Sequence, residues 1–331
     1  MPIVNENEWT QFLERYPDAH LLQTAEWGAL KDRFGWKPEC LVAGENGAQV
    51  LFRRLPLGLT LAYIPKGPLG PDFKELLPEL EALCRKNRAV FLKIEPDAWE
   101  GEAGWEDQLK AHGFQASGHN IQPRRTIMVD IGGAEDEILA RMKQKTRYNI
   151  RLAGNKDVVV TQTDDIVEFS DMMGETGTRD GFGVHSLEYY QAAYKLFSPQ
   201  GDCALFAAKY EEEPLAGLMA FSRGARAWYV YGASTNRHRN RMPTYLIQWE
   251  AIRWARERGC QEYDLWGVPD ENTDELEAQF NQRADGLWGV YRFKRGFGGA
   301  LRRTAGSWDK VFNPAAYAFY KMIILRGRAA E

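Results

Sequence analysis

Hydrophobic and polar positions follow the same order of patterns twice along the chain. In the first copy, residues 40–55 place two apolar runs around an Asn46–Gly47 turn, which is typical of a β-hairpin. We expect an apolar strand at 61–65, an amphipathic helix at 72–86 and a second apolar strand at 89–96. The order hairpin, strand, helix, strand predicts a mostly antiparallel sheet with helices packed on it.

The second copy repeats this order later in the chain. It has a hairpin at 204–221, a strand at 227–234, a helix at 244–258 and a closing strand at 262–269. A repeat of this length indicates two duplicated α+β domains rather than a solenoid of short units. Each domain then resembles the GNAT acyltransferase fold.

Segments outside the two copies complete the domains. Residues 116–131 predict a strand, residues 135–156 a single helix, and residues 307–328 a helical tail. The tail does not fit the pattern of the second copy, so we assign it to the first domain. The expected domains are 1–133 with 306–331, and 134–305.

Composition and charge narrow the classes of function. The chain has 331 residues, a formal net charge of −4 and a mean hydropathy of −0.49. No apolar run approaches the roughly 20 residues of a membrane helix, and no signal-peptide pattern opens the chain, so we expect a cytoplasmic protein without a transmembrane segment. The negative charge argues against a DNA-coating protein. The four cysteines lack metal-ligand spacing, so no metal is expected.

Basic residues nevertheless gather in three short stretches, at 141–156, 237–241 and 292–303. The first of them holds six basic residues and no acidic one. Any one stretch taken alone is better explained as a solvated face. Three such stretches in one half of the chain suggest a ligand that carries phosphate.

Phrases spread in order over almost the whole chain resemble the Fem-type (FemABX) peptidyltransferases. They are QTAEWGALK, YIPKGPLG, KTRYNIRLAGNKDVVV, PTYLIQWEAIRWA, EYDLWG and YRFKRGFGG, with the paired hairpins ENGAQ and EEEPLAG. This family makes the peptide bridges of bacterial peptidoglycan from aminoacyl-tRNA. The chain has no charged heptad segment, so it resembles the armless form of the family.

The resemblance implies an aminoacyltransferase with no cofactor. Its partners would be aminoacyl-tRNA and a peptidoglycan precursor, either a nucleotide-linked or a lipid-linked muropeptide, whose stem-peptide amine accepts the amino acid. A lipid-linked acceptor would bring a peripheral contact with the membrane.

Four residues are assigned to the acceptor by the resemblance. Lys31 matches a lysine that grips the diphosphate of the muropeptide. His185 stands where the family usually has an arginine as the second grip, and a neutral imidazole offers one donor where a guanidinium offers five. Tyr189 and Tyr245 match tyrosines that line the acceptor channel.

Phe293 and Lys294 match the pair at the catalytic centre of the family. The reaction is attack by an amine on an activated ester, so the protein must position two substrates and stabilise an oxyanion. A cation such as Lys294 suits that task, with Phe293 stacking near the terminal adenine or bracing the lysine. Without the resemblance, Lys294 is better explained as part of an exposed basic turn.

No nucleophile motif accompanies the five histidines, so a covalent acyl-enzyme is not expected. Glu95 and Asp264 end equivalent strands of the two copies and are candidates for a general base. Of the two, we select Glu95. A structural role, in which these carboxylates tie down neighbouring loops, is equally open.

Arginines of two basic stretches are expected to contact phosphates of the tRNA acceptor stem. The candidates are Arg147, Arg151, Arg237, Arg239 and Arg241. For the first stretch, basic residues also suit the end of a helix.

Two other functions remain open. A GNAT-type N-acyltransferase would bind acyl-coenzyme A through a glycine-rich loop that opens a helix. Met242, Pro243 and Thr244 occupy that turn here, and proline has no N–H, which disfavours coenzyme A. The third function is a tRNA- or muropeptide-binding module without activity, against which the intact lysine of FKRGF argues.

Overall fold

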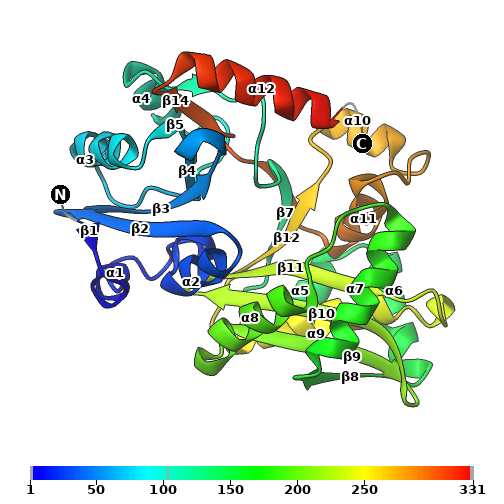
Figure 1. Ribbon diagram of the computed structural model, residues 1–331. Coiled ribbons are helices and arrows are strands. Elements are labelled where there is room, and N and C mark those ends of the chain that lie inside the picture. The colour runs from blue at the N-terminus through cyan, green and yellow to red at the C-terminus, as the bar shows by residue number, and fades with distance from the viewer. Residues whose placement is uncertain (1–2, 103, 329–331) are drawn as a thin grey trace. The chain divides into compact units, whose positions relative to one another are not determined.

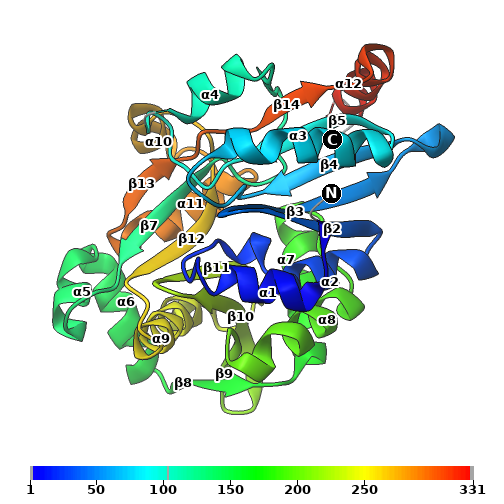
Figure 2. The same ribbon diagram turned by 90° about the vertical axis from the view of Figure 1, so that its left-hand side faces the viewer.

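The computed structural model describes residues 3–102 and 104–328. The chain divides into two compact units, Met1–Arg124 with Thr304–Glu331 (unit 1) and Arg125–Arg303 (unit 2). Each unit contains one seven-stranded sheet (Figures 1 and 2). Neighbouring strands are antiparallel except for one parallel pair in each sheet. The predicted fold class, two GNAT-like α+β domains, is confirmed.

The sheet of unit 1 contains the expected hairpin and the two strands that follow it, but the turn lies at Gly44 and Glu45 rather than at Asn46–Gly47, which pair with Ala43 and Val42. Gly44 has a φ of 61°, a left-handed conformation that glycine adopts without strain. Its strands, in spatial order, are β1 (Ile3–Val4), β2 (Trp36–Ala43), β3 (Asn46–Arg54), β4 (Thr60–Pro65), β5 (Ala89–Glu95), β14 (Trp308–Val311) and β6 (Gln115–Ala116).

Helices cover both faces of this sheet. Side chains alternate between the faces along each strand, so Ala62 packs with α3 (Phe73–Lys86) and α4 (Trp105–Ala111), while Leu61 packs with α12 (Pro314–Arg328). Helices α1 (Glu6–Leu13) and α2 (Ala25–Arg33) lie on the same face as α12. The unit is therefore a sheet between two helical layers, with α12 crossing one of its faces (Figure 1).

Unit 2 also consists of a seven-stranded sheet between helices, and four strands consecutive in the chain, β8 to β11, are neighbours in it. Its strands, in spatial order, are β13 (Ala300–Arg303), β7 (Arg125–Asp130), β12 (Glu262–Val268), β11 (Arg226–Ser234), β10 (Glu213–Arg223), β9 (Cys203–Tyr210) and β8 (Val158–Thr163). One core cluster joins the sheet to α5 (Glu135–Arg141), α6 (Gln144–Asn155), α9 (Pro243–Glu257), α10 (Thr273–Gln279) and α11 (Leu287–Lys294). The helices α7 (Ile166–Asp180) and α8 (Leu187–Phe197) pack on the other face.

The expected single helix over residues 135–156 is wrong, because the structure has two helices separated at Met142 and Lys143. Both residues have extended backbone, with ψ of 154° and 145°. The N–H of Lys143 donates to the carbonyl of Gly296 at 2.9 Å, a contact made by a distant segment. Helical periodicity continues across the break, which is why the sequence alone does not reveal it.

Two further segments differ from the expectation. Residues 308–311 form β14, paired with β5 and β6, so only the later part of the tail is helical. Strand β7 pairs with β12 and β13, so the second unit begins at Arg125 rather than near residue 134.

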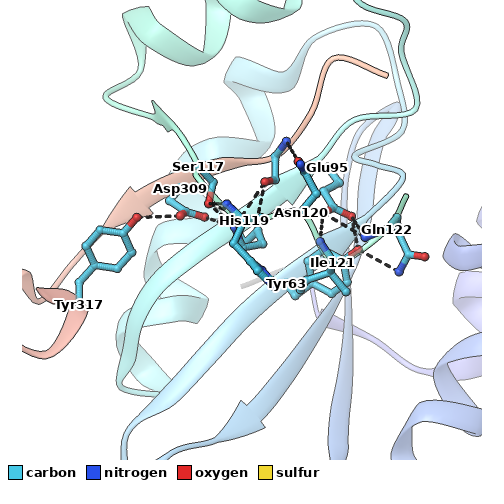
Figure 3. A network of polar contacts seen from close by, with 11 residues as sticks. Tyr63, Glu95, Ser117, His119, Asn120, Ile121, Gln122, Asp309 and Tyr317 are labelled. Carbon is cyan, nitrogen blue, oxygen red and sulfur yellow. Dashed lines mark hydrogen bonds and ion pairs between the residues drawn. The ribbon is translucent and has the colours of Figure 1, made fainter. Parts of the chain in front are cut away.

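A network of buried polar groups stabilises one side of unit 1 (Figure 3). Lys93 Nζ lies 2.8 Å from Asp309 Oδ1, and their side chains are 1% and 3% exposed. The ammonium also donates to Ser117 Oγ at 2.6 Å and to the carbonyl of His119 at 2.9 Å. Tyr317 of α12 donates to Asp309 Oδ2 at 2.7 Å. Strands β5 and β14, α12 and the segment after β6 are thus joined through one ion pair.

We expect Asp309→Asn to lower the free energy of unfolding by about 3 kcal/mol, because it leaves the Lys93 charge buried without a counter-ion. A double-mutant cycle of Lys93→Met and Asp309→Asn, measured by urea unfolding, should give a coupling of at least about 2 kcal/mol. The matched cycle at the exposed pair Lys110 and Glu106 should give less than about 0.5 kcal/mol. Equal couplings in the two cycles would contradict this account of the network.

Candidate active site

Lys294 is the last residue of α11, and its side chain is buried in unit 2 with 6% exposure. Its Nζ donates to the carbonyl of Gly267 at 2.8 Å and lies 5.4 Å from the centroid of the Tyr229 ring. An ammonium has three donors, and Gly267 is its one hydrogen-bond acceptor within residues 3–102 and 104–328. The ammonium form therefore has donors that make no hydrogen bond within this part of the chain.

The carbonyl of Gly267 is available to Lys294 because β12 bulges. Pairing between β12 and β7 is interrupted between Asp264 and Gly267, and Trp266 has a φ of 61°, in the left-handed region. A tryptophan rarely adopts this conformation, so the surrounding contacts must impose it.

Asp264 provides those contacts. Its Oδ1 accepts hydrogen bonds from the N–H of Trp266 at 2.7 Å and from the hydroxyl of Thr126 on β7. The carboxylate thus replaces part of the strand pairing that the bulge removes, and it places a negative charge near Lys294. Asp264 is a positioning residue for the lysine, consistent with the structural role considered for it from the sequence.

Burial lowers the pKa of Lys294 from 10.5 to about 7, and the charge of Asp264 opposes that shift only in part. At neutral pH the amine is therefore close to an even mixture of its two protonation states. As an ammonium, Lys294 can donate a hydrogen bond to a developing negative charge. Because its pKa is close to neutral, it can also gain or lose a proton near pH 7.

Phe293, the residue before Lys294, packs in a cluster of aromatic rings. Phe293 meets the ring of Tyr245 at 5.0 Å and 72°, and that of Phe297 at 5.1 Å and 73°. Tyr245 stands in the first turn of α9. The structure therefore brings three of the sequence-predicted residues, Lys294, Phe293 and Tyr245, to one side of the unit 2 sheet.

The glycines of the RGFGG motif allow the chain after Lys294 to pack closely. Gly298 has a φ of 80°, and a Cβ there would lie 2.0 Å from the carbonyl oxygen of Arg141. A residue with a side chain would push this loop away from the break between α5 and α6.

His185 and Tyr189 belong to a separate aromatic cluster of unit 2. The exposed His185 ring stacks on Tyr189 with centroids 3.8 Å apart and an interplanar angle of 13°. Tyr231 meets both rings nearly edge-on, and its hydroxyl lies 3.3 Å from that of Tyr189. The imidazole is thus presented on a rigid tyrosine platform beside α8.

Lys31 lies on α2 in unit 1, with its Nζ 4.5 Å from the centroid of the Trp27 ring. Burial, together with the positive charge of Arg53, lowers the pKa of Lys31 to about 8. Arg53 belongs to β3, and its guanidinium lies 5.5 Å from the ring centroid of Trp36 on β2. Two neighbouring cations repel each other, and a bound anion would relieve that repulsion.

Sequence reasoning missed Arg53, although the phrase FRRL at the end of the first hairpin contains it. It also missed Thr126, Tyr229 and Gly267, since only the folded sheet brings these residues to Lys294 or to Asp264.

Glu95 is 4% exposed, and both of its carboxylate oxygens accept hydrogen bonds (Figure 3). The donors are the Tyr63 hydroxyl at 2.5 Å and the N–H groups of Ile121 and Gln122, at 2.5 Å and 3.1 Å for their shortest contacts. Burial raises the pKa of Glu95, and these hydrogen bonds oppose the rise. These contacts favour a structural role for the Glu95 carboxylate. The role of Glu95 as a general base stays an untested prediction.

The five candidate arginines for tRNA divide into two groups. Arg147 donates to the carbonyl of Met142 at the end of α5, Arg237 pairs with Glu213 at 3.0 Å, and Arg241 donates to the carbonyl of Lys156. Arg151 and Arg239 are exposed, with no ion pair or side-chain hydrogen bond among the described residues. The second group can bind phosphate without breaking an internal contact.

The described residues hold no cluster of three metal-ligating side chains. The turn before α9 is also unsuited to a pyrophosphate cradle. Its amides are used internally, since Met242 and Tyr245 each donate to a carbonyl within the turn, and Pro243 has no N–H.

The lowered pKa of Lys294 predicts a pH-dependent stability. Between about pH 7 and pH 10.5 the unfolded chain holds a proton on this lysine that the folded protein has lost, so the free energy of unfolding rises with pH. Lys294→Met removes this contribution. The stability difference between the parent and the variant should change by roughly 3 to 5 kcal/mol in favour of the parent across that range. Denaturant unfolding at a series of pH values measures it, and parallel profiles would contradict the shift.

The whole chain is similar to proteins of one family. The FemAB family model matches residues 4–208 and 200–324. The lipid II:glycine glycyltransferase of Staphylococcus haemolyticus (strain JCSC1435) is 26% identical over 410 aligned residues, covering 98% of this chain and 95% of that protein. The lipid II:glycine glycyltransferase of Staphylococcus aureus (strain USA300) is also 26% identical, over 411 residues, with the same shares covered. These alignments are longer than the chain, so both relatives contain insertions that it lacks.

Solved structures agree on the fold. The crystal structure of FemX has a TM-score of 0.84 and 24% identity, covering 96% of this chain and 98% of that one. The tandem GNAT protein from the clavulanic acid biosynthesis pathway has a TM-score of 0.53 and 12% identity, covering 93% and 96%. With a family model that matches nearly all of the residues and a fold shared with FemX, the chain belongs to the FemAB family.

Proposed function

We propose that the protein transfers an amino acid from aminoacyl-tRNA to the stem-peptide amine of a lipid-linked peptidoglycan precursor. The FemAB family is an aminoacyltransferase family, and the enzyme class follows from membership. The names of the curated relatives point to lipid II as the acceptor and to glycine as the first amino acid to test.

The environment of Lys294 is the observation that carries this proposal. The acceptor amine attacks the ester carbonyl, a C–N bond forms, and the carbonyl oxygen becomes an oxyanion. The unused donors of Lys294 would bind that oxyanion in a site from which water is largely excluded. When the intermediate collapses, the C–O bond to the tRNA ribose breaks, and the ribose oxygen takes up the proton that the amine has lost.

The acceptor diphosphate is assigned to unit 1. Lys31 and Arg53 form a pair of neighbouring cations there, and the lowered pKa of Lys31 supports a preference for an anion at this place. Arg53 offers the planar guanidinium that position 185 lacks in this chain.

The tRNA is assigned to unit 2, the unit that contains Lys294. Arg151 and Arg239, with the exposed Lys145 on α6, have side chains available for phosphate contacts. Tyr148 lies on α6 between Lys145 and Arg151 and is 61% exposed, so it adds a ring on which a base can stack.

The test is incubation with glycyl-tRNA and lipid II, followed by mass spectrometry of the product. We expect one glycine to be added, and Lys294→Met to lower kcat/KM by roughly 100-fold while both KM values stay nearly unchanged. Lys294→Arg should recover only part of the rate, because a guanidinium cannot occupy the same point. Arg292→Met is the matched control, an exposed residue of the same helix that should keep the parent rate. Transfer from acetyl-coenzyme A without tRNA would overturn the proposal.

The assignment of the diphosphate gives a second prediction. Lys31→Ala and Arg53→Ala should each raise the KM for lipid II about tenfold with kcat little changed, because each loses one charge-assisted contact. Arg33→Ala, an exposed residue of the same helix as Lys31, serves as the control and should have no effect. With a free stem peptide as acceptor, which has no diphosphate, all three variants should match the parent protein. If Lys31→Ala and Arg53→Ala raised the KM for the free stem peptide as much as the KM for lipid II, the two cations would not bind the diphosphate.

A further inference from the structure

Helix α12 exposes apolar side chains in a regular pattern. Phe319, Met322 and Ile323 are 58%, 40% and 50% exposed, and their spacing of three and four residues places them on one side of the helix. Tyr317 and Tyr320 of the same helix pack instead against Phe91 of the sheet, at 5.0 Å and 4.9 Å between ring centroids. The helix is therefore fixed to the sheet by one side and presents an apolar strip on another.

Leu57 is the most exposed large apolar side chain among the described residues, at 87%. It lies in the turn between β3 and β4 and has a φ of 61° and a ψ of 24°, a left-handed conformation that leucine adopts only at a cost in energy. Glycine or asparagine would be easier to accommodate there. Folding alone therefore does not account for a leucine at this tip.

The turn and α12 are neighbours in unit 1. Leu55 and Leu59, on either side of Leu57, pack in the same small cluster as Tyr317 and Tyr320. Both views of the ribbon show the turn between β3 and β4 close to α12 (Figures 1 and 2). We name Leu57, Phe319, Met322 and Ile323 the apolar surface.

Basic residues accompany the apolar surface although the chain as a whole has a charge of −4. The segments 53–60, 85–90 and 314–328 contain basic residues and no acidic one. Arg54 is exposed next to the turn, and Arg88 Nη1 lies 3.1 Å from where a Cβ on Gly58 would be. An apolar surface with a basic surround matches an anionic bilayer, whereas a second copy of the chain would bring like charges together.

The apolar surface is continuous with the cations assigned to the diphosphate. The Arg53 guanidinium lies 5.5 Å from the ring centroid of Trp36, and Trp36 packs in the same cluster as Tyr317 and Tyr320 of α12. Arg53 also acts on Lys31. The pair of cations therefore adjoins the part of unit 1 that carries the exposed apolar side chains.

We propose that the apolar surface docks unit 1 on an anionic lipid bilayer. Leu57, Phe319, Met322 and Ile323 enter the boundary between headgroups and acyl chains, and the nearby arginines and Lys321 contact lipid phosphates. Docking then holds Lys31 and Arg53 at the level of the headgroups, where the diphosphate of a lipid-linked acceptor is found. The role given to docking, that of presenting the lipid-linked acceptor, rests on the proposed function. Docking needs no spanning segment, and within residues 3–102 and 104–328 no helix is long and apolar enough to cross a bilayer.

The test is sedimentation of the full chain with vesicles that contain no lipid II. The protein should bind vesicles of phosphatidylglycerol and phosphatidylcholine, bind pure phosphatidylcholine much more weakly, and lose affinity as salt is added. Leu57→Asn, and separately the pair Phe319→Ser with Ile323→Ser, should each lower the affinity about tenfold or more. Asparagine suits the left-handed conformation at position 57, so that variant should fold at least as stably as the parent protein.

Val167→Ser is the matched control, because Val167 is 51% exposed on α7 of unit 2 and outside the apolar surface. It should bind vesicles as the parent protein does. Equal affinity of all variants for vesicles would overturn the proposal, as would a loss of self-association on size exclusion with unchanged vesicle binding. The latter result would assign the surface to a second copy of the chain.

Failure of docking and failure of the proposed function are distinguishable. Leu57→Asn should transfer glycine to a soluble stem peptide at the parent rate and be impaired only with lipid II in vesicles. A parent protein that uses lipid II in vesicles but never sediments with them would refute docking alone. Vesicle binding by a protein that transfers nothing to lipid II would support docking and refute the function.

Discussion

The burial of one ammonium group at Lys294 is the constraint on which the rest of unit 2 depends. A charge in this position is costly unless polar groups compensate for it, and the chain supplies them through a bulge in β12, the carboxylate of Asp264 and the carbonyl of Gly267. Trp266 accepts a left-handed backbone to make that arrangement possible. The compensation is incomplete, since the amine keeps unused donors and a pKa of about 7. Incomplete compensation is what separates a site that can act on a substrate from a structural ion pair.

Unit 1 contains the opposite case on a strand of its sheet. Lys93 on β5 is as deeply buried as Lys294, but it has Asp309 as a counter-ion together with a serine hydroxyl and a backbone carbonyl. Nothing remains for that ammonium to bind, and its contacts instead join β14 and α12 to the sheet. The two buried lysines thus differ in how far their surroundings satisfy the ammonium: the contacts of Lys93 join elements of unit 1, whereas Lys294 keeps donors that the proposed reaction would use.

The sequence patterns correctly predicted those helices and strands that depend on local periodicity. Both hairpins, both crossover helices and the strands after them occur as expected, because the alternation of apolar and polar residues determines them locally. The first turn was placed two residues too late, since Asn46 and Gly47 already pair with Ala43 and Val42 and the turn is formed by Gly44 and Glu45. The break at Met142 was missed since it depends on Gly296, far along the chain, and β14 was missed because a short strand of four residues has little periodicity to detect. At the site, Lys294, Phe293 and Tyr245 were found through the family motif, whereas Arg53 and Tyr229 become visible only when strands place them beside a lysine.

The charge distribution bears on how a protein with an overall negative charge would bind the two polyanionic substrates proposed for it. Long-range attraction would be weak at a net charge of −4, so binding must depend on local groups within a Debye length of the phosphates. Arg147, Arg237 and Arg241 are already engaged within unit 2, which leaves few arginines there for nucleic acid. In unit 1, burial and the positive charge of Arg53 lower the pKa of Lys31, so a diphosphate bound beside the two side chains, as proposed, would be attracted by both. In the proposed function, selectivity for the substrate then comes from placing a few cations at defined points.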